Sequence, residues 1–421
     1  MSIRELARVV SVVLLVLAAP LGAHAAEKSV ALATPHSGSR QVSYSTWVIE
    51  GSTIRLRVML PKAAADAIAE PGKPPPRINE VADYVHAQFT ARSAGGACKL
   101  IDQGEGFGEV YTMALTPGIY RYELIFNCPS TEGVTLGDSL LFLRVPTHVN
   151  YARVQVNGGN PWLGMFDRTH QTLQAAGSKA GTPPALFARQ GALKLVRDLD
   201  RLCVLAGLLL LAMAWEDLAA IVAGLVVGYA LSLVAALARV AVLDPAIGEG
   251  AVMLLIVLLG GAAIRSHVGG LPLSRRARIG TAITLGLVIA AATGAAFLKG
   301  ATLGLTVGGL GLAGLAFLWL AGPQRPRWLL AAPAGLFAFI SGMSQASDLD
   351  LLRLPGRALG PVLAAHDLGA AGAAVAIATA ASILVWLGFR KLLPLRNPLG
   401  ETAGAGLIGL GVFWFVTALV S

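Results

Sequence analysis

Residues 219–242 read AAIVAGLVVGYALSLVAALARVAV, an apolar run in which Arg239 is the only charged residue. About 20 apolar residues are enough to cross a bilayer as a helix, so this run predicts a transmembrane helix. The composition agrees, because hydrophobic residues make up 55% of the 421-residue chain and charged residues only 14%, where a soluble domain carries about 25% charged residues. A wholly soluble enzyme, a disordered chain and a disulfide-dense secreted module are therefore excluded.

Further apolar segments lie on both sides of this run. With it they occupy residues 202–217, 219–242, 249–265, 278–298, 301–321, 327–345, 361–388 and 402–420. We therefore predict a multi-pass α-helical membrane bundle of about eight spans within residues 187–421. Lys and Arg gather in the loops near 266–278, 322–327 and 389–400, which favours a cytoplasmic position for these loops.

The N-terminus has the pattern of a secretory signal peptide. Arg4 and Arg8 precede the short apolar core Val9–Leu17, and Ala23-His24-Ala25 fits a cleavage site. We predict a signal peptide at 1–25 and an exported domain at 26–165, joined by a linker at 166–186 to the membrane part. The chain is expected in a bacterial inner membrane, with its N-terminal domain outside the cytoplasm.

The exported region shows the alternation of half-buried strands. Apolar and polar residues alternate along Ser52–Leu60 and Tyr120–Phe126, and Leu140–Val145 and Tyr151–Val156 are further strand candidates. Apolar residues at helical spacing between Ile78 and Phe89 predict one helix. This predicts a β-sandwich-like domain in front of the membrane bundle.

Two of the three cysteines lie in this exported region, where disulfides persist. We predict a bond between Cys98 and Cys128, which would close a loop of about 30 residues and contribute about 3 kcal/mol. Cys203 falls in an apolar helix and is expected to be a buried thiol.

The stretch Gly191-Ala-Leu-Lys-Leu-Val-Arg-Asp-Leu-Asp-Arg201, with Trp215-Glu-Asp-Leu after an apolar span, resembles the opening of the HupE/UreJ membrane proteins. These are hydrogenase and urease accessory proteins regarded as nickel or cobalt permeases. Further motifs in the same order fall on Tyr229-Ala230, Glu249, 335–342 and His366-Asp-Leu-Gly369. In the exported domain, Phe126–Pro129 and Pro146-Thr-His148 are also similar to one branch of the family. The resemblance implies a transporter-like membrane protein.

The chain departs from the family pattern at its histidines. Lys194 and Arg201 stand where the family has histidines in the opening motif, and Ser341 replaces another. Nickel and cobalt prefer imidazole and carboxylate ligands, and an ammonium and a guanidinium repel a dication. We therefore expect no metal site of the family type, no cofactor, and no nickel transport.

Ionisable and polar residues within or beside the spans form the candidate site, because such residues are costly in a membrane and usually functional. They are Lys194, Asp198, Asp200, Arg201, Tyr229, Glu249, Ser341, His366 and Asp367. The cluster 194–201 reads either as a self-neutralising interfacial ion cluster or as a gate or anion-attracting vestibule. His366-Asp367 reads either as a helix-entry cap or as a pair that relays protons or binds a cation. Tyr229, Ser341 and Gln345 fit interhelical hydrogen bonds or a substrate path. Asp348 and Asp350 fall in an outer loop and are expected to be solvated.

Catalytic signatures are missing from the sequence: it has no Walker loop, H-E-x-x-H, C-x-x-C or Rossmann fingerprint. We therefore expect no enzymatic activity. The formal net charge of +9 is assigned to cytoplasmic loops rather than to nucleic-acid binding. Two functions stay open. One is a transporter whose exported domain binds a ligand or an envelope partner. The other is a non-transporting scaffold in the bilayer that serves such a partner. The sequence carries no signal for an oligomeric state.

Overall fold

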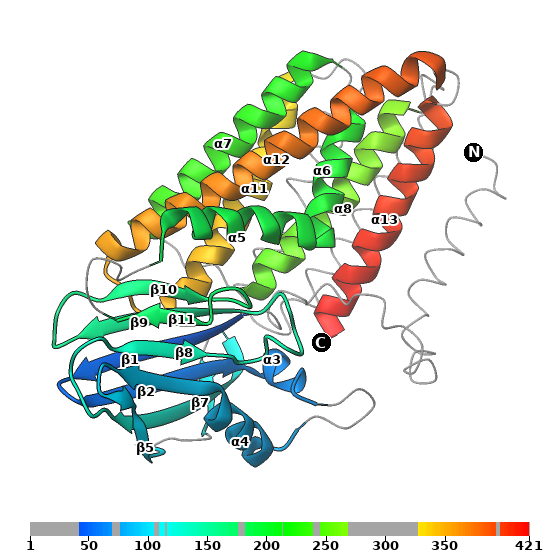
Figure 1. Cartoon of the computed structure of the whole chain (residues 1–421). Helices are drawn as coiled ribbons and strands as arrows, with labels where there is room; N and C mark the ends of the chain where they lie inside the picture. Colours follow the sequence, from blue (N-terminus) through cyan, green and yellow to red (C-terminus); the bar gives the residue numbers. More distant parts are fainter. Residues whose placement is uncertain are drawn as a thin grey trace.

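The computed structural model describes residues 42–69, 76–104, 109–113, 116–175, 182–212, 214–238, 245–267, 327–392 and 396–420. A β-sheet part built from residues 42–175 lies against one end of a bundle of helices (Figure 1). The predicted signal peptide, and the predicted spans at 278–298 and 301–321, lie outside these described residues.

The larger sheet of the β-sheet part has the strand order β10-β9-β1-β2-β7-β5, and β6 also pairs with β7. Its strands are β1 (Val42–Glu50), β2 (Thr53–Pro61), β5 (Lys99–Asp102), β6 (Glu109–Met113), β7 (Thr116–Asn127), β9 (Val149–Val156) and β10 (Trp162–Phe166). A tight turn at Gly51, whose φ is +58°, joins β1 to the antiparallel β2. The strands predicted at 52–60, 120–126 and 151–156 are confirmed by β2, β7 and β9.

The second sheet has the order β11-β8-β3-β4, from strands β3 (Phe89–Ser93), β4 (Gly96–Ala97), β8 (Thr135–Asp138) and β11 (Thr172–Gln174). Trp47, Leu56 and Leu124 of the larger sheet join Leu136 of the second in one buried core. The helices α3 (Lys62–Asp66) and α4 (Ile78–Gln88) add to this core, and α4 confirms the predicted helix. The two-sheet domain predicted from the alternation is present.

One strand prediction in this part was wrong. Residues 140–144 form turns, and Val145 lies outside any strand. Leu141 has a positive φ of 62°, and the Leu143 side chain is 93% exposed. An apolar run of this length is compatible with a strand by composition alone. The buried neighbours Leu140 and Phe142 instead hold a loop between β8 and β9.

The predicted disulfide is confirmed, since Cys98 and Cys128 are bonded. Cys98 precedes β5 and Cys128 follows β7, and these strands pair with Lys99 opposite Asn127. The strand pairing thus brings the two cysteines together. Cys203 is a buried free thiol in the bundle, as expected.

The helical part consists of α5 (Pro184–Arg197), α6 (Leu199–Leu211), α7 (Trp215–Leu237), α8 (Pro245–His267), a short 3₁₀ turn (Arg327–Leu330), α11 (Ala331–Asp350), α12 (Gly356–Leu392) and α13 (Arg396–Val420). Helix α5 lies across the end of the bundle, between the sheets and the other helices (Figure 1). The longer helices run alternately away from the β-sheet part and back towards it.

The expectation of about eight spans is overturned. Within the described residues, three helices are long and apolar enough to cross a membrane: Trp215–Leu237, Gly248–Ser266 and Gly356–Ile383. Helix α6 has 13 residues and is about 20 Å long, short of the roughly 30 Å of a hydrocarbon core. Helix α11 carries Ser341, Gln345 and Asp348 in its second half and is too polar. The described side chains of α13 cover only residues 400–415.

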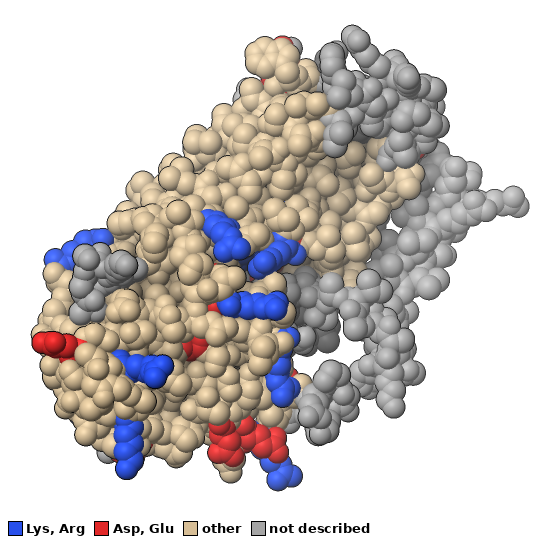
Figure 2. Space-filling view, viewed as in Figure 1, with Lys and Arg blue, Asp and Glu red and all other residues tan. Residues whose placement is uncertain are grey.

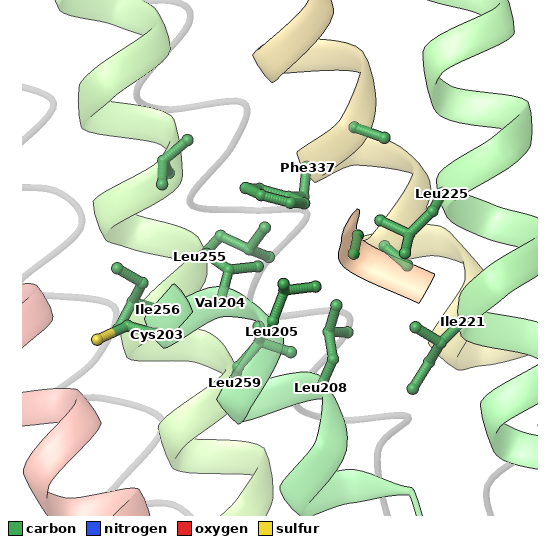
Figure 3. Packing of buried hydrophobic residues seen from close by; sticks show 14 of the residues in the cluster. Cys203, Val204, Leu205, Leu208, Ile221, Leu225, Leu255, Ile256, Leu259 and Phe337 are labelled. Atoms are coloured by element: carbon green, nitrogen blue, oxygen red, sulfur yellow. The ribbon is translucent and has the colours of Figure 1, made fainter. Parts of the chain in front are cut away.

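The helices share one apolar core. Side chains from α6, α7, α8 and α11 point towards one another there, among them Leu205, Leu225, Ile256 and Phe337 (Figure 3). Helix α7 lies so close to α11 that a Cβ added to Gly228 would be 2.2 Å from the Gly335 carbonyl oxygen. Small residues let helices approach in this way.

A third cluster joins the two parts of the molecule. Tyr44, Tyr151 and Met165 extend from β1, β9 and β10 on the sheet face opposite the domain core. They pack with Phe187 of α5 and with the end of α11 at Leu349. The larger sheet is therefore buried on both faces here, and its second face covers the end of the bundle.

Candidate functional site

The predicted polar residues come from six helices that meet beneath the β-sheet part. Lys194 lies on α5, and Asp198 at the break before α6. Asp200 and Arg201 open α6. Tyr229 lies on α7, Glu249 on α8, Ser341 on α11, and His366 with Asp367 on α12. Asp198, Arg201, Tyr229, Ser341, His366 and Asp367 are all buried. Residues up to 173 positions apart in the sequence are thus brought into one region.

Lys194 links α5 to the end of α11. Its Nζ donates a hydrogen bond to Gln345 Oε1 at 2.9 Å and lies 3.7 Å from Asp348 Oδ2. The Lys194 and Asp348 side chains are 15% and 26% exposed. Asp348 therefore belongs to the last turns of α11 and pairs with a cation, so the expectation of a solvated loop residue was wrong.

Arg201 is the second cation of the site. Its Nε lies 3.2 Å from Asp198 Oδ2, and both side chains are about nine-tenths buried. Asp200 lies within electrostatic reach of Glu249 as well as of Arg201. The break between α5 and α6 thus places two carboxylates and a guanidinium within one turn, and α8 adds a third carboxylate.

His366 and Asp367 lie 10 and 11 residues into α12. His366 Nδ1 and Asp367 Oδ1 are 3.5 Å apart, and Asp367 Oδ2 is 3.5 Å from Ser232 Oγ on α7. Tyr229 of the same helix faces Asp367 and Ser341. Within the described residues, His366 Nε2, Tyr229 Oη and Ser341 Oγ are buried without a hydrogen bond of full geometry. Buried polar atoms are normally satisfied by protein or water.

Two tyrosines of the larger sheet close the site from the β-sheet side. Gln345 Nε2 donates a hydrogen bond to the Tyr151 hydroxyl at 3.3 Å. The Tyr44 hydroxyl forms a hydrogen bond with the Asp348 carboxylate. Burial raises the pKa of both phenols, and the carboxylate of Asp348 raises it further. Both hydroxyls therefore stay protonated at neutral pH. We call Tyr44 and Tyr151 the roof of the site.

The site extends from the roof into the bundle. Asp367 is 11 residues into α12 and Ser341 is nine residues before the end of α11. At 1.5 Å per residue, both lie about 15 Å along their helices. The ionisable groups therefore form a column that starts at the sheet and reaches well into the apolar part of the helices.

The roof residues, Ser232 and the role of Asp348 were missed by sequence reasoning. Tyr44 lies in β1, a strand that the sequence analysis did not predict, and the alternation along Tyr151–Val156 predicts only that Tyr151 faces away from the domain core. No sequence pattern indicates that this outer face of the sheet is also buried, against the helices. Asp348 carried one usable signal, because it is three residues after Gln345 and shares its helix face.

A second buried polar group lies inside the β-sheet part. Ser43 Oγ is 2.9 Å from His148 Nε2, and Asn150 Nδ2 donates to Asp138 Oδ2 at 2.5 Å. The Leu140 amide also donates to Asp138 at 2.7 Å. Burial raises the pKa of Asp138 to about 7 despite these bonds. This group connects β1, β8 and β9 and lies in the core between the sheets.

The acidic and histidine residues of the described part do not gather into a group of three or more suited to a metal ion. Comparison with known proteins assigns no family, since no family model and no curated protein matches the chain.

Proposed function

We propose that the chain is a transporter-like integral membrane protein of the HupE/UreJ type. In this proposal it lies in a bacterial inner membrane, and its β-sheet domain is outside the cytoplasm. The observation that carries the proposal is the column of buried ionisable residues between Lys194 and Asp367. Such residues are expensive inside a membrane and typically mark the path of an ion or a solute.

The surface of the molecule supports the membrane location. On the face seen in Figure 2, Lys, Arg, Asp and Glu gather over the β-sheet part and its boundary with the helices, and the helices present few charges. Helix α5 lies at this boundary and exposes Arg189 and Arg197. Basic side chains on a helix of this kind suit the headgroup layer of a bilayer.

The charges of the site favour a cationic solute. Its carboxylates are Asp198, Asp200, Glu249, Asp348 and Asp367, and its cations are Lys194 and Arg201. Five negative and two positive charges leave an excess of three carboxylates when all are ionised. The two resident cations stand where the family resemblance places metal-binding histidines, so a monovalent cation fits this balance better than a dication.

The roof gives the β-sheet domain a role in access. Tyr44 and Tyr151 close the site from the β-sheet side through Asp348 and Gln345. A solute arriving from that side has to pass between the sheet and the end of the bundle. We infer that the domain moves on the bundle to admit it.

A scaffold without transport is the second candidate. The pairing of Lys194 with Asp348 and of Arg201 with Asp198 favours it, because the cations of the chain neutralise part of the site without any solute. In this case the exported domain would bind an envelope partner, and the charged column would only hold the helices together.

Flux through the purified protein in proteoliposomes tests the proposal. Protons, Na⁺, K⁺, Ni²⁺, Co²⁺, Zn²⁺ and Cu⁺ would be offered in turn to the wild type, to Asp200→Asn and to the matched control Asp350→Asn, whose carboxylate is exposed at the end of α11. We expect flux of a monovalent cation that Asp200→Asn abolishes and Asp350→Asn preserves. Folded wild-type protein that moves none of these ions would support the scaffold instead.

A further inference from the structure

The innermost pair of the site, His366 and Asp367, is enclosed almost completely. Their side chains are only 4% and 7% exposed. They face three other helices, α5, α7 and α11, and each of these approaches closely. A Cβ added to Gly191 of α5 would be 2.0 Å from the His366 carbonyl oxygen. A Cβ added to Gly342 of α11 would meet Ser232 Oγ at 2.1 Å and Asp367 Oδ2 at 3.3 Å.

This packing restricts what the pair can bind. A hydrated ion or an organic solute needs volume next to the ligating atoms. The near-complete burial of both side chains and the approach of Gly342 to the Asp367 carboxylate leave little of it. A proton needs no volume. Among cationic ligands it is therefore the one that suits the space around His366 and Asp367.

The hydrogen bonds of the pair leave polar atoms on both side chains incompletely satisfied. Among the described residues, Asp367 has two neighbours at hydrogen-bond range, His366 Nδ1 and Ser232 Oγ, and both are at 3.5 Å. These contacts are too long to compensate a buried carboxylate fully. His366 Nε2 is buried without a hydrogen-bond partner in the described part of the chain. The pair therefore has an imidazole nitrogen without a hydrogen-bond partner among the described residues, next to a carboxylate held by two long contacts.

The surrounding charges determine how many protons the pair holds. Lys194 of α5 and Arg201 of α6 act on His366, and Tyr229 of α7 faces Asp367. Asp348 of α11 is paired with Lys194, and Asp198, Asp200 and Glu249 lie around Arg201. The two nearby cations disfavour a second positive charge. The pair can therefore take up at most one proton.

We propose that His366 and Asp367 bind one exchangeable proton, and that this proton is the coupling ion of the proposed transporter. Binding adds a proton from water to the pair and forms no other bond, and release returns it. The coupling role rests on the proposed function, but the binding of the proton does not. Ser232 serves as a positioning residue that holds the carboxylate towards α7.

The test is a pH titration of the full-length protein in nanodiscs by NMR, with ¹³C-labelled histidine. His366→Gln assigns the His366 resonance among the seven histidines of the chain. We expect this resonance to titrate in the wild type and in the control Asp350→Asn. In Asp367→Asn its midpoint should move down by about one pH unit or more, because the carboxylate that favours the imidazolium is gone.

Other outcomes would overturn the proposal. One is a His366 resonance that stays unchanged with pH in folded protein, and another is the same midpoint in Asp367→Asn as in the wild type. A midpoint that moves with Na⁺ concentration at constant ionic strength would assign the pair to sodium instead. If Asp367→Asn does not fold, Ser232→Ala keeps the charge, and its midpoint is expected to differ from that of the wild type.

This experiment separates the two proposals. If the pair titrates but the protein shows no flux, the proton site is supported and the transporter function is contradicted. If flux depends on Asp200 but the pair does not titrate, the transporter function is supported and the proton site is contradicted.

Discussion

At the scale of single residues, Lys194 on α5 has a structural role, because it pairs with the buried end of α11. Its ammonium is the cation nearest to Asp348, and both side chains are mostly buried. Removing one partner of a buried pair leaves the other charge uncompensated. The stability of the site therefore depends on the pair rather than on either residue.

We predict that Lys194→Met destabilises the protein by about 3–5 kcal/mol. The double variant Lys194→Met/Asp348→Asn should recover much of this loss, because the stranded carboxylate is gone. Thermal unfolding in detergent measures both, and the exposed Lys99→Met is the matched control. Equal losses in the single and the double variant would show that the two charges do not act as a pair.

Asp138 gives the β-sheet domain a pH dependence with a definite sign. Its pKa rises from an ordinary value of 3.8 to about 7 in the folded chain. The folded state thus binds a proton that the unfolded state releases between these values. Its contribution to stability is complete below pH 3.8 and is lost as the pH rises towards 7.

We therefore expect the wild type to unfold at a higher temperature at pH 5 than at pH 8. The slope from this group amounts to at most about 1.4 kcal/mol per pH unit. Asp138→Asn should flatten the profile, whereas the exposed Asp102→Asn should leave it as in the wild type. Thermal unfolding followed by tryptophan fluorescence reads the difference, and an unchanged slope in Asp138→Asn would assign it to another group.

Sequence reasoning at this scale found many of the residues but not their partners. The cost of burying a charge in a membrane singled out Lys194, Arg201 and Asp367 from their positions within or beside apolar segments. Asp348 was misplaced because a run of polar residues at the end of an apolar segment also fits a loop. The partner of Lys194 is fixed by the docking of α5 on the bundle, which no local pattern contains.

At the scale of elements, the contact between α5 and α12 holds the site together. A Cβ at Gly369 of α12 would lie 1.8 Å from the Ala188 carbonyl oxygen of α5. Helix α5 carries Lys194 and α12 carries His366 and Asp367. The close approach of these two backbones therefore sets the distance between the cation and the pair.

We predict that Gly369→Ala pushes α5 away from α12 and lowers stability by about 1–3 kcal/mol. Gly372→Ala, one turn further along α12, meets nothing within 4 Å and should be neutral or slightly stabilising. Unfolding temperatures of the two variants decide the point. Equal temperatures would contradict the close packing of α5 on α12.

Periodicity predicted most element types but not the spans. The alternation along Ser52–Leu60 and the helical spacing after Ile78 each produced the expected element. The apolar segment at 202–217 was read as a span, yet α6 ends at Leu211 and α7 begins at Trp215. Hydropathy averages over such a break, so length and apolar character alone overestimated the number of spans.

At the scale of the whole molecule, the larger sheet contributes its two faces to two different hydrophobic clusters. One face holds Trp47 in the domain core, and the other presents Tyr44 and Tyr151 to the bundle. A strand buried on both faces loses the alternation that identifies its outward side. The site therefore lies between two parts, each predicted separately, and its roof could not be predicted from either part.

The central claim is that a solute reaches the charged column by passing under the β-sheet domain. The exposed Arg357 at the start of α12 donates a hydrogen bond to Asn160 beside β10, so these two positions face each other across the boundary. The variant Asn160→Cys/Arg357→Cys can be closed with a bis-maleimide whose diol linker is cleaved by periodate, which spares the Cys98–Cys128 bond. The two single-cysteine variants, treated in the same way, are the controls.

Flux of the transported cation through this variant in proteoliposomes is the most direct measurement. We predict that flux stops when the domain is cross-linked to the bundle and returns after cleavage, and that the single-cysteine controls stay active throughout. Fully cross-linked protein that transports as fast as the untreated variant would contradict the account, because the solute would then not pass under the roof.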